Sequence, residues 1–382
     1  MMQKESKEIS IVKEAFKSYY DSIDPNEIIP KEVEKREFGF GDFEEKISAR
    51  HFSFKSGEEL IRYIKENTPA HINFSTAYYS NPSGRPMENK GLIKNDLVFD
   101  IDATDLKLEC KIRHGNSWIC QNCLERAKNE AIRLIEDFLI PDFGVSKDEI
   151  EVNFSGSRGY HVRVEREDMK QLGEEERREI VDYITGRGII SERIFDYIKG
   201  RGIRGPTPES KGWPGKVARS VISALDSKEK LESLGIDRKA SSLLTKKRQL
   251  VEMGIRSGNW DMVDIKKKEA FWKNVVSAVA IMQSDNIDRN VTIESSHLIR
   301  LPNTLHGGSG LVAKKLRNYE LSSFDPMKHA IAFRSGELEV FANTKEELLM
   351  NGISFGPYDN QKVSLPSYAA IYLLLKGFAR IS

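Results

Sequence analysis

The chain has 382 residues, of which 39% are hydrophobic and 31% are charged, so it can bury a core and divide into more than one substructure. Its 59 Lys and Arg residues almost balance its 58 Asp and Glu residues, so overall charge does not mark a nucleic-acid binder and any attraction for phosphate must be local. The longest strongly apolar stretch, residues 368–375, is far shorter than the roughly 20 residues of a membrane span, and the charged N-terminus lacks the apolar core of a signal peptide, so we expect a globular cytoplasmic protein.

The first part of the chain is predicted to be one helix followed by strands. Helical periodicity covers residues 11–22, and strand-like segments follow at 36–40 and 49–54. Two further strands are expected within 71–79 and 96–102, each bounded by Pro, Gly or Asn.

The strand LVFDID places two carboxylates on one face. Alternation along a strand directs Asp100 and Asp102 to one side and Phe99 and Ile101 to the other, into a core. Carboxylates about 7 Å apart along a strand can flank Mg²⁺ ions, which activate an attacking oxygen and stabilise a leaving one in phosphoryl transfer. The pattern by itself also fits two solvated aspartates, or the D-x-D motif of a glycosyltransferase.

The next feature is a compact set of metal-ligand residues. Cys110, His114, Cys120 and Cys123 form the pattern C-x3-H-x5-C-x2-C, and every cysteine of the chain takes part. Three thiolates and an imidazole suit tetrahedral Zn²⁺, and four protein ligands close the site to water. We therefore predict a structural zinc site, here called the zinc knuckle (residues 110–123).

A helix is expected at 124–139, followed by two strands at 151–155 and 160–164 that a glycine turn joins. The glycines of this turn, Gly156 and Gly159, let backbone N–H groups approach an anion. Its side chains supply donors suited to a triphosphate: Ser155, Arg158 and His161. The alternative is an ordinary hairpin turn.

From about residue 167 to 285 the chain becomes charge-rich and helical in period, interrupted by a Gly/Pro segment at 200–216, which predicts a helical insertion. Strand patterning returns at 291–302. A second basic segment lies there, with Arg300 and His306 before two glycines, and favours another anion site.

Taken in this order, DLVFDID, the zinc knuckle, SGSRGYH and LIRLPNTLHG resemble the catalytic small subunit of archaeal and eukaryotic DNA primases, and the resemblance extends from Arg36 to residue 377. It implies an α/β (α+β) fold: a primase-type catalytic domain with a mixed β-sheet carrying the metal site, a zinc knuckle and an inserted helical subdomain. The expected domains are 1–166 with 286–382 for the catalytic domain and 167–285 for the helical subdomain.

The resemblance also assigns site residues. Asp100 and Asp102 match the family's metal-binding aspartates, and Asp288 matches the third because it precedes His306 by the family's spacing of eighteen positions; Glu294 is a competing candidate. The residues implied to bind the nucleotide are Ser155, Arg158, His161, Arg300 and His306, with Arg50 and His71 as weaker matches in the same pocket.

The implied activity is DNA-dependent synthesis of short RNA primers on single-stranded DNA for replication, by nucleotidyl transfer with two Mg²⁺ or Mn²⁺ ions. The implied partners are a primase large subunit carrying an iron–sulfur cluster, for which this chain lacks the cysteines, together with NTPs or dNTPs, the template, and a replicative helicase or polymerase. A nucleoid-associated location would follow. The alternatives are another primase-polymerase acting in DNA repair, a D-x-D glycosyltransferase, and a non-enzymatic nucleic-acid-binding module.

Overall fold

The computed structural model describes residues 7–198, 202–284, 288–317 and 320–382. The chain packs as two compact units: unit 1 comprises Met1–Ile132, Lys147–Arg177 and Asp288–Ser382, and unit 2 comprises Arg133–Ser146 and Arg178–Ile287. Unit 2 thus begins later than the expected residue 167 and also takes residues 133–146. The expected boundary at 285/286 lies outside the described residues. No helix in the described ranges is long and apolar enough to cross a membrane.

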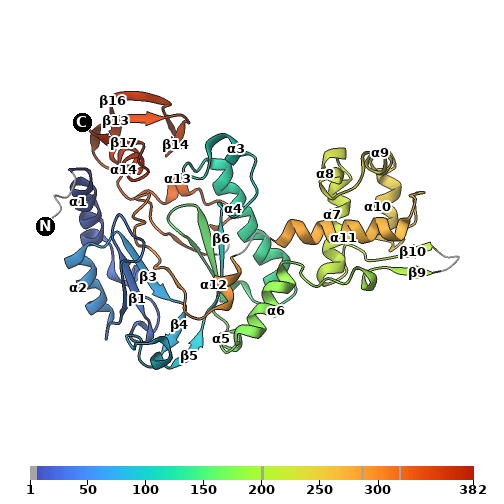
Figure 1. The fold of residues 1–382 in the computed structure, drawn as a ribbon, viewed down its shortest axis with the longest axis horizontal. Coiled ribbons are helices and arrows are strands. Elements are labelled where there is room, and N and C mark those ends of the chain that lie inside the picture. Colours follow the sequence, from blue (N-terminus) through green and yellow to red (C-terminus); the bar gives the residue numbers. More distant parts are fainter. Residues whose placement is uncertain (1–6, 199–201, 285–287, 318–319) are drawn as a thin grey trace. The chain divides into compact units, whose positions relative to one another are not determined.

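The first sheet of unit 1 has four antiparallel strands in the order β11-β3-β1-β2. These strands are β1 (Phe38–Gly41), β2 (Ala49–Phe52), β3 (His71–Ser75) and β11 (Leu298–Arg300). Two helices, α1 (Lys7–Ser22) and α2 (Gly57–Asn67), lie along the sheet (Figure 1). Phe16 of α1 and Leu60 of α2 are fully buried in one cluster with Phe38 of β1, so the apolar stripe of each helix closes this core.

The second sheet carries the DLVFDID strand. Its order is β12-β7-β8-β6, formed by β6 (Leu97–Asp102), β7 (Ile150–Phe154), β8 (Gly159–Val164) and β12 (Lys315–Arg317). Every strand pairing in the described part of the chain is antiparallel, so the expected mixed sheet is wrong. The reason is topological: β8 returns through a short turn and inserts between β7 and β6, so the two strands that would be parallel neighbours are kept apart.

The two faces of the second sheet differ as the sequence alternation predicts. Phe99 and Ile101 of β6 are fully buried, whereas Asp100 and Asp102, which alternate with them along the strand, are half-buried. On the apolar side, the rings of Phe154 and Tyr160 pack against Phe324, with centroids 5.8 and 6.5 Å away. A solid apolar layer therefore supports a polar face.

The remaining elements of unit 1 frame these sheets. A third sheet, β16-β13-β17, packs with the apolar helix α14 (Ser367–Leu375) near the C-terminus (Figure 1). The other strands are β4 (Ala77–Tyr79), β5 (Leu92–Asn95), β13 (Glu337–Thr344), β14 (Leu348–Met350), β15 (Ile353–Phe355), β16 (Tyr358–Pro366) and β17 (Ala379–Ile381). The other helices are α3 (Cys110–His114), α4 (Gln121–Arg133, whose last residue belongs to unit 2), α5 (Glu167–Lys170), α12 (Arg289–Ile293) and α13 (Pro326–His329).

Unit 2 is mainly helical. Its helices are α6 (Glu174–Ile184, which starts in unit 1), α7 (Gly212–Ala224), α8 (Lys228–Ser233), α9 (Arg238–Lys246), α10 (Arg248–Arg256) and α11 (Lys268–Ser284). Its one described hairpin, β9 (Asp196–Ile198) with β10 (Gly202–Arg204), coincides with the start of the Gly/Pro interruption.

Two local predictions need correction. The helix expected at 124–139 is α4 followed by a π-helical stretch, Leu134–Leu139. Within 291–302, only Leu298–Arg300 is a strand, because Asp288 caps the short helix α12 through Asn290 and draws Val291–Ile293 into it. This cap positions a carboxylate beside β6.

Candidate active site

The pairing of β6 with β8 brings the two main motifs together. Asp100 lies directly opposite His161, and Asp102 lies opposite Gly159. Opposed residues of an antiparallel pair project from the same face. Accordingly, His161 Nε2 lies 3.6 Å from Asp100 Oδ1, and Arg158 Nε donates to Asp102 Oδ2 at 2.9 Å.

The two carboxylates of β6 have opposite electrostatic environments. Burial, and then the neighbouring charges of Asp102 and Asp288, raise the pKa of Asp100 to about 7. Burial also acts to raise the pKa of Asp102, but the Thr104 backbone N–H and the Arg158 guanidinium outweigh it and lower that pKa. Asp100 is therefore the carboxylate whose negative charge lacks compensation, which is the condition that a bound cation relieves.

Asp288 reaches this acidic group through the backbone. Its N–H donates to the Asp100 carbonyl at 2.9 Å in an isolated antiparallel bridge. Its side chain accepts from the Asn290 N–H at 2.9 Å as the cap of α12, and its charge contributes to the raised pKa of Asp100. The competing Glu294 instead pairs with His297 Nε2 at 3.1 Å and is half exposed. Of the two candidates, Asp288 is the one beside Asp100.

The basic turn between β7 and β8 is held by its own backbone. Ser155 N donates to the Gly159 carbonyl at 2.9 Å, and Gly159 N donates to Ser155 Oγ at 3.1 Å. Gly156 has φ +83°, and an added Cβ there would stand 2.8 Å from His306 Cβ. Glycine is thus required both by the left-handed backbone and by close packing against the second basic segment.

That second basic segment supplies a buried cation. Arg300 Nη2 contacts His71 Nδ1 at 2.6 Å, while its Nε and Nη1 atoms are buried and have no hydrogen-bond partner. Burial lowers the pKa of Arg300 to about 10, so it stays charged at neutral pH. Burial and Arg300 together lower the pKa of His161 to about 4 and that of His306 well below its usual value. Both histidines are therefore neutral hydrogen-bonding groups.

A cleft of about 320 Å³ gathers Asp100, Asp102 and the basic residues, whereas Asp288 is not among its lining residues. Its lining combines Asp100, Asp102 and the predicted basic residues with further residues, among them three polar ones outside the predicted motifs: Lys46, Asn73 and Lys376. Lys46 lies in the exposed loop between β1 and β2, and Lys376 follows α14, and no local pattern distinguishes either from an ordinary surface lysine. The complete lining is Lys46, Asn73, Asp100, Asp102, Ser155, Ser157, Arg158, His161, Val291, Leu298, Ile299, Arg300, His306, Gly308 and Lys376.

Two weaker candidates have different positions. His71 is buried directly behind the cleft, where its ring meets that of His306 edge-on with centroids 4.9 Å apart. Arg50 does not line the cleft. Its Nε donates to Glu37 Oε1 at 2.8 Å, and its guanidinium also contacts the Ser296 carbonyl. The structure thus joins His71 to the site through Arg300 and engages Arg50 elsewhere.

The zinc knuckle converges as predicted. The ligand atoms of Cys110, His114, Cys120 and Cys123 all lie within 4.8 Å of one another. Cys123 Sγ stands 3.5 Å from Cys110 Sγ, 3.7 Å from Cys120 Sγ and 3.7 Å from His114 Nε2. Ligands of a tetrahedral zinc ion with bonds of about 2.3 Å are separated by about 3.8 Å, so this cluster can hold such a metal. His114 Nδ1 contacts the Gly115 carbonyl at 2.8 Å, which leaves Nε2 for a metal.

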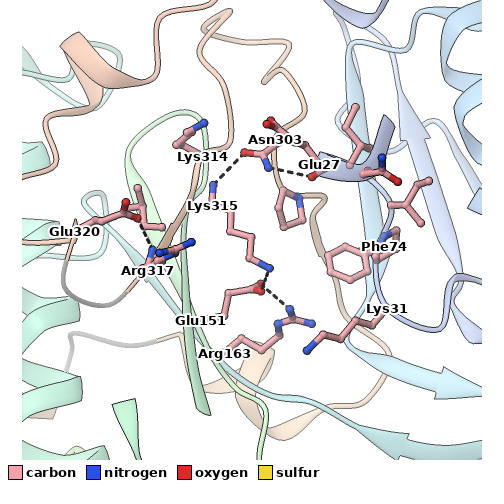
Figure 2. A pocket seen from close by; sticks show the side chains of 16 residues that line it. Glu27, Lys31, Phe74, Glu151, Arg163, Asn303, Lys314, Lys315, Arg317 and Glu320 are labelled. Atoms are coloured by element: carbon pink, nitrogen blue, oxygen red, sulfur yellow. Dashed lines mark hydrogen bonds and ion pairs between the residues drawn. The ribbon is translucent and has the colours of Figure 1, made fainter. Parts of the chain in front are cut away.

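A second cavity, of about 360 Å³, lies beside β7 and β12 (Figure 2). It contains several cations, but Glu151 at its centre accepts from both Arg163 and Lys315, and Lys31 pairs with Glu165 at 2.9 Å. Its charges are largely compensated within the protein. The cleft at β6 is therefore the stronger candidate for an anionic ligand.

Comparison with known proteins agrees with this chemistry. The family model described as DNA primase small subunit matches residues 99–317, which is more than half of the chain. DNA primase small subunit PriS of Methanothrix thermoacetophila is 34% identical over 402 residues, covering 99% of this chain and 100% of the relative. The proteins of the same name from Archaeoglobus fulgidus and Nitrosopumilus maritimus are 35% and 30% identical, covering 96% and 98% of this chain and 97% and 99% of the relatives. The chain therefore belongs to the DNA primase small subunit family, and it is an enzyme of the nucleotidyltransferase class.

Proposed function

We propose that this protein is the catalytic subunit of a DNA primase, which synthesises short RNA primers on single-stranded DNA by two-metal nucleotidyl transfer. The observation that carries the proposal is the pairing of β6 with β8. This pairing brings Asp100, whose negative charge lacks compensation, next to hydrogen-bond donors suited to phosphate within one cleft. A cleft that combines carboxylates with cations suits a triphosphate bound through divalent ions.

Asp100, Asp102 and Asp288 would hold these ions, Mg²⁺ or Mn²⁺. The raised pKa of Asp100 supports the fit, because burial and its carboxylate neighbours leave an excess of negative charge there. When bound, such ions lower the pKa of the attacking 3′-hydroxyl of the primer and neutralise charge on the leaving pyrophosphate.

The basic residues would bind the triphosphate and align it. Ser155 and the turn around Gly156 offer a hydroxyl and backbone N–H groups, and the neutral His161 and His306 offer ring N–H donors. Arg300 brings a charge that no carboxylate in the described ranges neutralises. These groups would fix the α-phosphorus in line with the attacking oxygen, so most of the rate enhancement comes from positioning and electrostatics, and no protein nucleophile is required.

Further assignments belong to the same proposal. The zinc knuckle would hold one structural Zn²⁺, as its thiolate and imidazole spacing supports. A large subunit would complete the enzyme, as the name "small subunit" of the relatives suggests, and would supply the iron–sulfur cluster. The template and NTPs or dNTPs are the expected ligands. A helicase or polymerase as replication partner and a cytoplasmic, nucleoid-associated location remain predictions.

The decisive assay incubates the protein, with and without its large subunit, with single-stranded DNA, labelled NTPs or dNTPs and Mg²⁺ or Mn²⁺. Short labelled oligonucleotides should form with the wild type and not with the Asp100→Ala, Asp102→Ala double variant. The absence of product under all these conditions would refute primase activity, and product only from pre-annealed primers would favour the repair polymerase.

The third carboxylate has its own matched pair of variants. Asp288→Ala should abolish synthesis because Asp288 lies beside Asp100, whereas Glu294→Ala should retain it because Glu294 pairs with His297. The reverse outcome would transfer the metal-binding role to Glu294.

A further inference from the structure

Two lysines from distant parts of the chain line the same cleft. Lys46 comes from the loop between β1 and β2, and Lys376 directly follows α14, near the C-terminus. Neither belongs to the two basic segments. Within the described residues, neither ammonium group has a carboxylate partner at ion-pair distance.

The other positive charges of the cleft are less available to a ligand. Arg158 shares its charge with Asp102, because its Nε lies 2.9 Å from Asp102 Oδ2. Arg300 would then be the one cation of the predicted set without a carboxylate partner in the described ranges. A triphosphate and the pyrophosphate that leaves from it carry several negative charges, more than a single guanidinium balances.

Lys376 lies near two other cations in a poorly solvated part of the cleft. Burial, and then the nearby cations Arg158 and Lys46, lower the pKa of Lys376 to about 8, against the opposing influence of Asp102. Its Nζ stands 5.6 Å from the centre of the Tyr372 ring. Cations placed close together are stabilised when an anion binds between them.

The second cavity provides the contrast (Figure 2). There Glu151 already neutralises Arg163 and Lys315, so burial of cations alone does not make an anion site in this protein. In the cleft at β6, Lys46 and Lys376 line the same space as Asp100 and Asp102, and neither lysine has an ion-pair partner among the described residues.

We propose that Lys46 and Lys376 bind the β- and γ-phosphates of the incoming nucleotide and hold the pyrophosphate that leaves. The proposal rests on the nucleotidyl transfer proposed above and adds two binding residues to it. It also gives the C-terminal helix α14 a role in nucleotide binding, because it carries Lys376 to the cleft.

The test uses the full chain with its large subunit and the variants Lys46→Ala, Lys376→Ala and the double variant. Each single variant should raise the KM for NTP and the inhibition constant of inorganic pyrophosphate about tenfold, the loss expected for one charge-assisted hydrogen bond. ATP binding, measured by calorimetry without template and with Ca²⁺ in place of Mg²⁺, should weaken by a similar factor. Lys376→Arg should restore most of the affinity because it keeps the charge.

Lys314→Ala is the matched control, because Lys314 lines the second cavity instead. It should leave the KM for NTP, pyrophosphate inhibition and the thermal midpoint at their wild-type values. Affinity for single-stranded DNA, measured by fluorescence anisotropy, should be the same in every variant.

Unchanged pyrophosphate inhibition and unchanged ATP binding in the double variant would overturn the proposal. A loss of DNA affinity with the KM for NTP unchanged would also overturn it, since the lysines would then contact the template. If the wild-type complex makes no product, the proposed function fails, whereas the ATP and pyrophosphate binding measurements still decide the role of the lysines.

Discussion

Removing the charge of Asp100 should stabilise the metal-free protein while abolishing its activity. Asp100 is half-buried beside other carboxylates, and its pKa is raised to about 7 from an ordinary value of 3.8. At about 1.36 kcal/mol per pKa unit, this shift corresponds to a cost of about 4 kcal/mol when the carboxylate is ionised in the folded state. The side chain is 28% exposed, so solvent reduces the effect, and we expect Asp100→Asn to gain about 2 kcal/mol.

The sign and the pH window follow from the direction of the shift. Because the pKa of Asp100 is higher in the folded than in the unfolded state, the folded protein keeps a proton between about pH 4 and pH 7 that the unfolded chain has released. The stability contributed by this group therefore falls as pH rises through that window. Asp100→Asn removes the penalty, so its advantage over the wild type should be larger at pH 8 than at pH 5.

Asp102→Asn is the matched comparison with the opposite sign. Although burial acts to raise its pKa, the Thr104 backbone N–H and Arg158 lower it overall, so the ionised Asp102 stabilises the fold above its unfolded-state pKa. Its amide variant should lose stability at pH 8. The assay is urea unfolding of each variant at both pH values, in buffer freed of divalent ions by a chelating resin before protein is added. A loss of stability in Asp100→Asn equal to that in Asp102→Asn, or a gain independent of pH, would refute the reasoning.

Three other outcomes are expected. Arg158→Ala should raise the KM for NTP about tenfold or more, through the loss of a charge-assisted contact with phosphate; steady-state kinetics that match the wild type would remove Arg158 from the triphosphate site. Cys120→Ala should lower the zinc content from one ion per chain, measured by elemental analysis of protein purified without chelator, and metal retained at full occupancy would contradict the zinc assignment. Asp96→Asn should cost about 3 kcal/mol or more in urea unfolding, since this buried carboxylate pairs with Arg36 at 2.9 Å and Arg163 at 3.2 Å; a cost below 1 kcal/mol would show that the cations find other partners.

Local sequence patterns correctly predicted those features that depend on interactions between residues close together in the sequence. The alternation in LVFDID correctly predicted that Asp100 and Phe99 lie on opposite faces of the sheet. The spacing of the four zinc-knuckle residues correctly predicted that their side chains converge. The same patterns failed where tertiary contacts decide. Residues 291–293 have the β-branched composition of a strand, yet the cap formed by Asp288 makes them helical.

The phosphate side of the cleft was predicted only in part, for a similar reason. Arg158 and His306 stand in recognisable glycine-rich segments, whereas Lys46 and Lys376 reach the cleft through the packing of a loop and of the C-terminal helix. No sequence pattern within a few residues of either lysine indicates that its side chain lines the cleft. Arg50 shows the converse, because its sequence position suggested the pocket while Glu37 and Ser296 hold its guanidinium elsewhere.

The direct opposition of β6 and β8 has a consequence for how this enzyme can change. Asp100 faces His161 and Asp102 faces Gly159, so each acidic residue has a fixed partner across the ladder. Deleting one codon within either strand would turn every following side chain to the opposite face, and the acidic and phosphate-binding groups would be lost in a single event. Codon insertions and deletions should therefore be tolerated in the surface loops and selected against across these two strands, and engineering of either motif has to treat the pair as one unit.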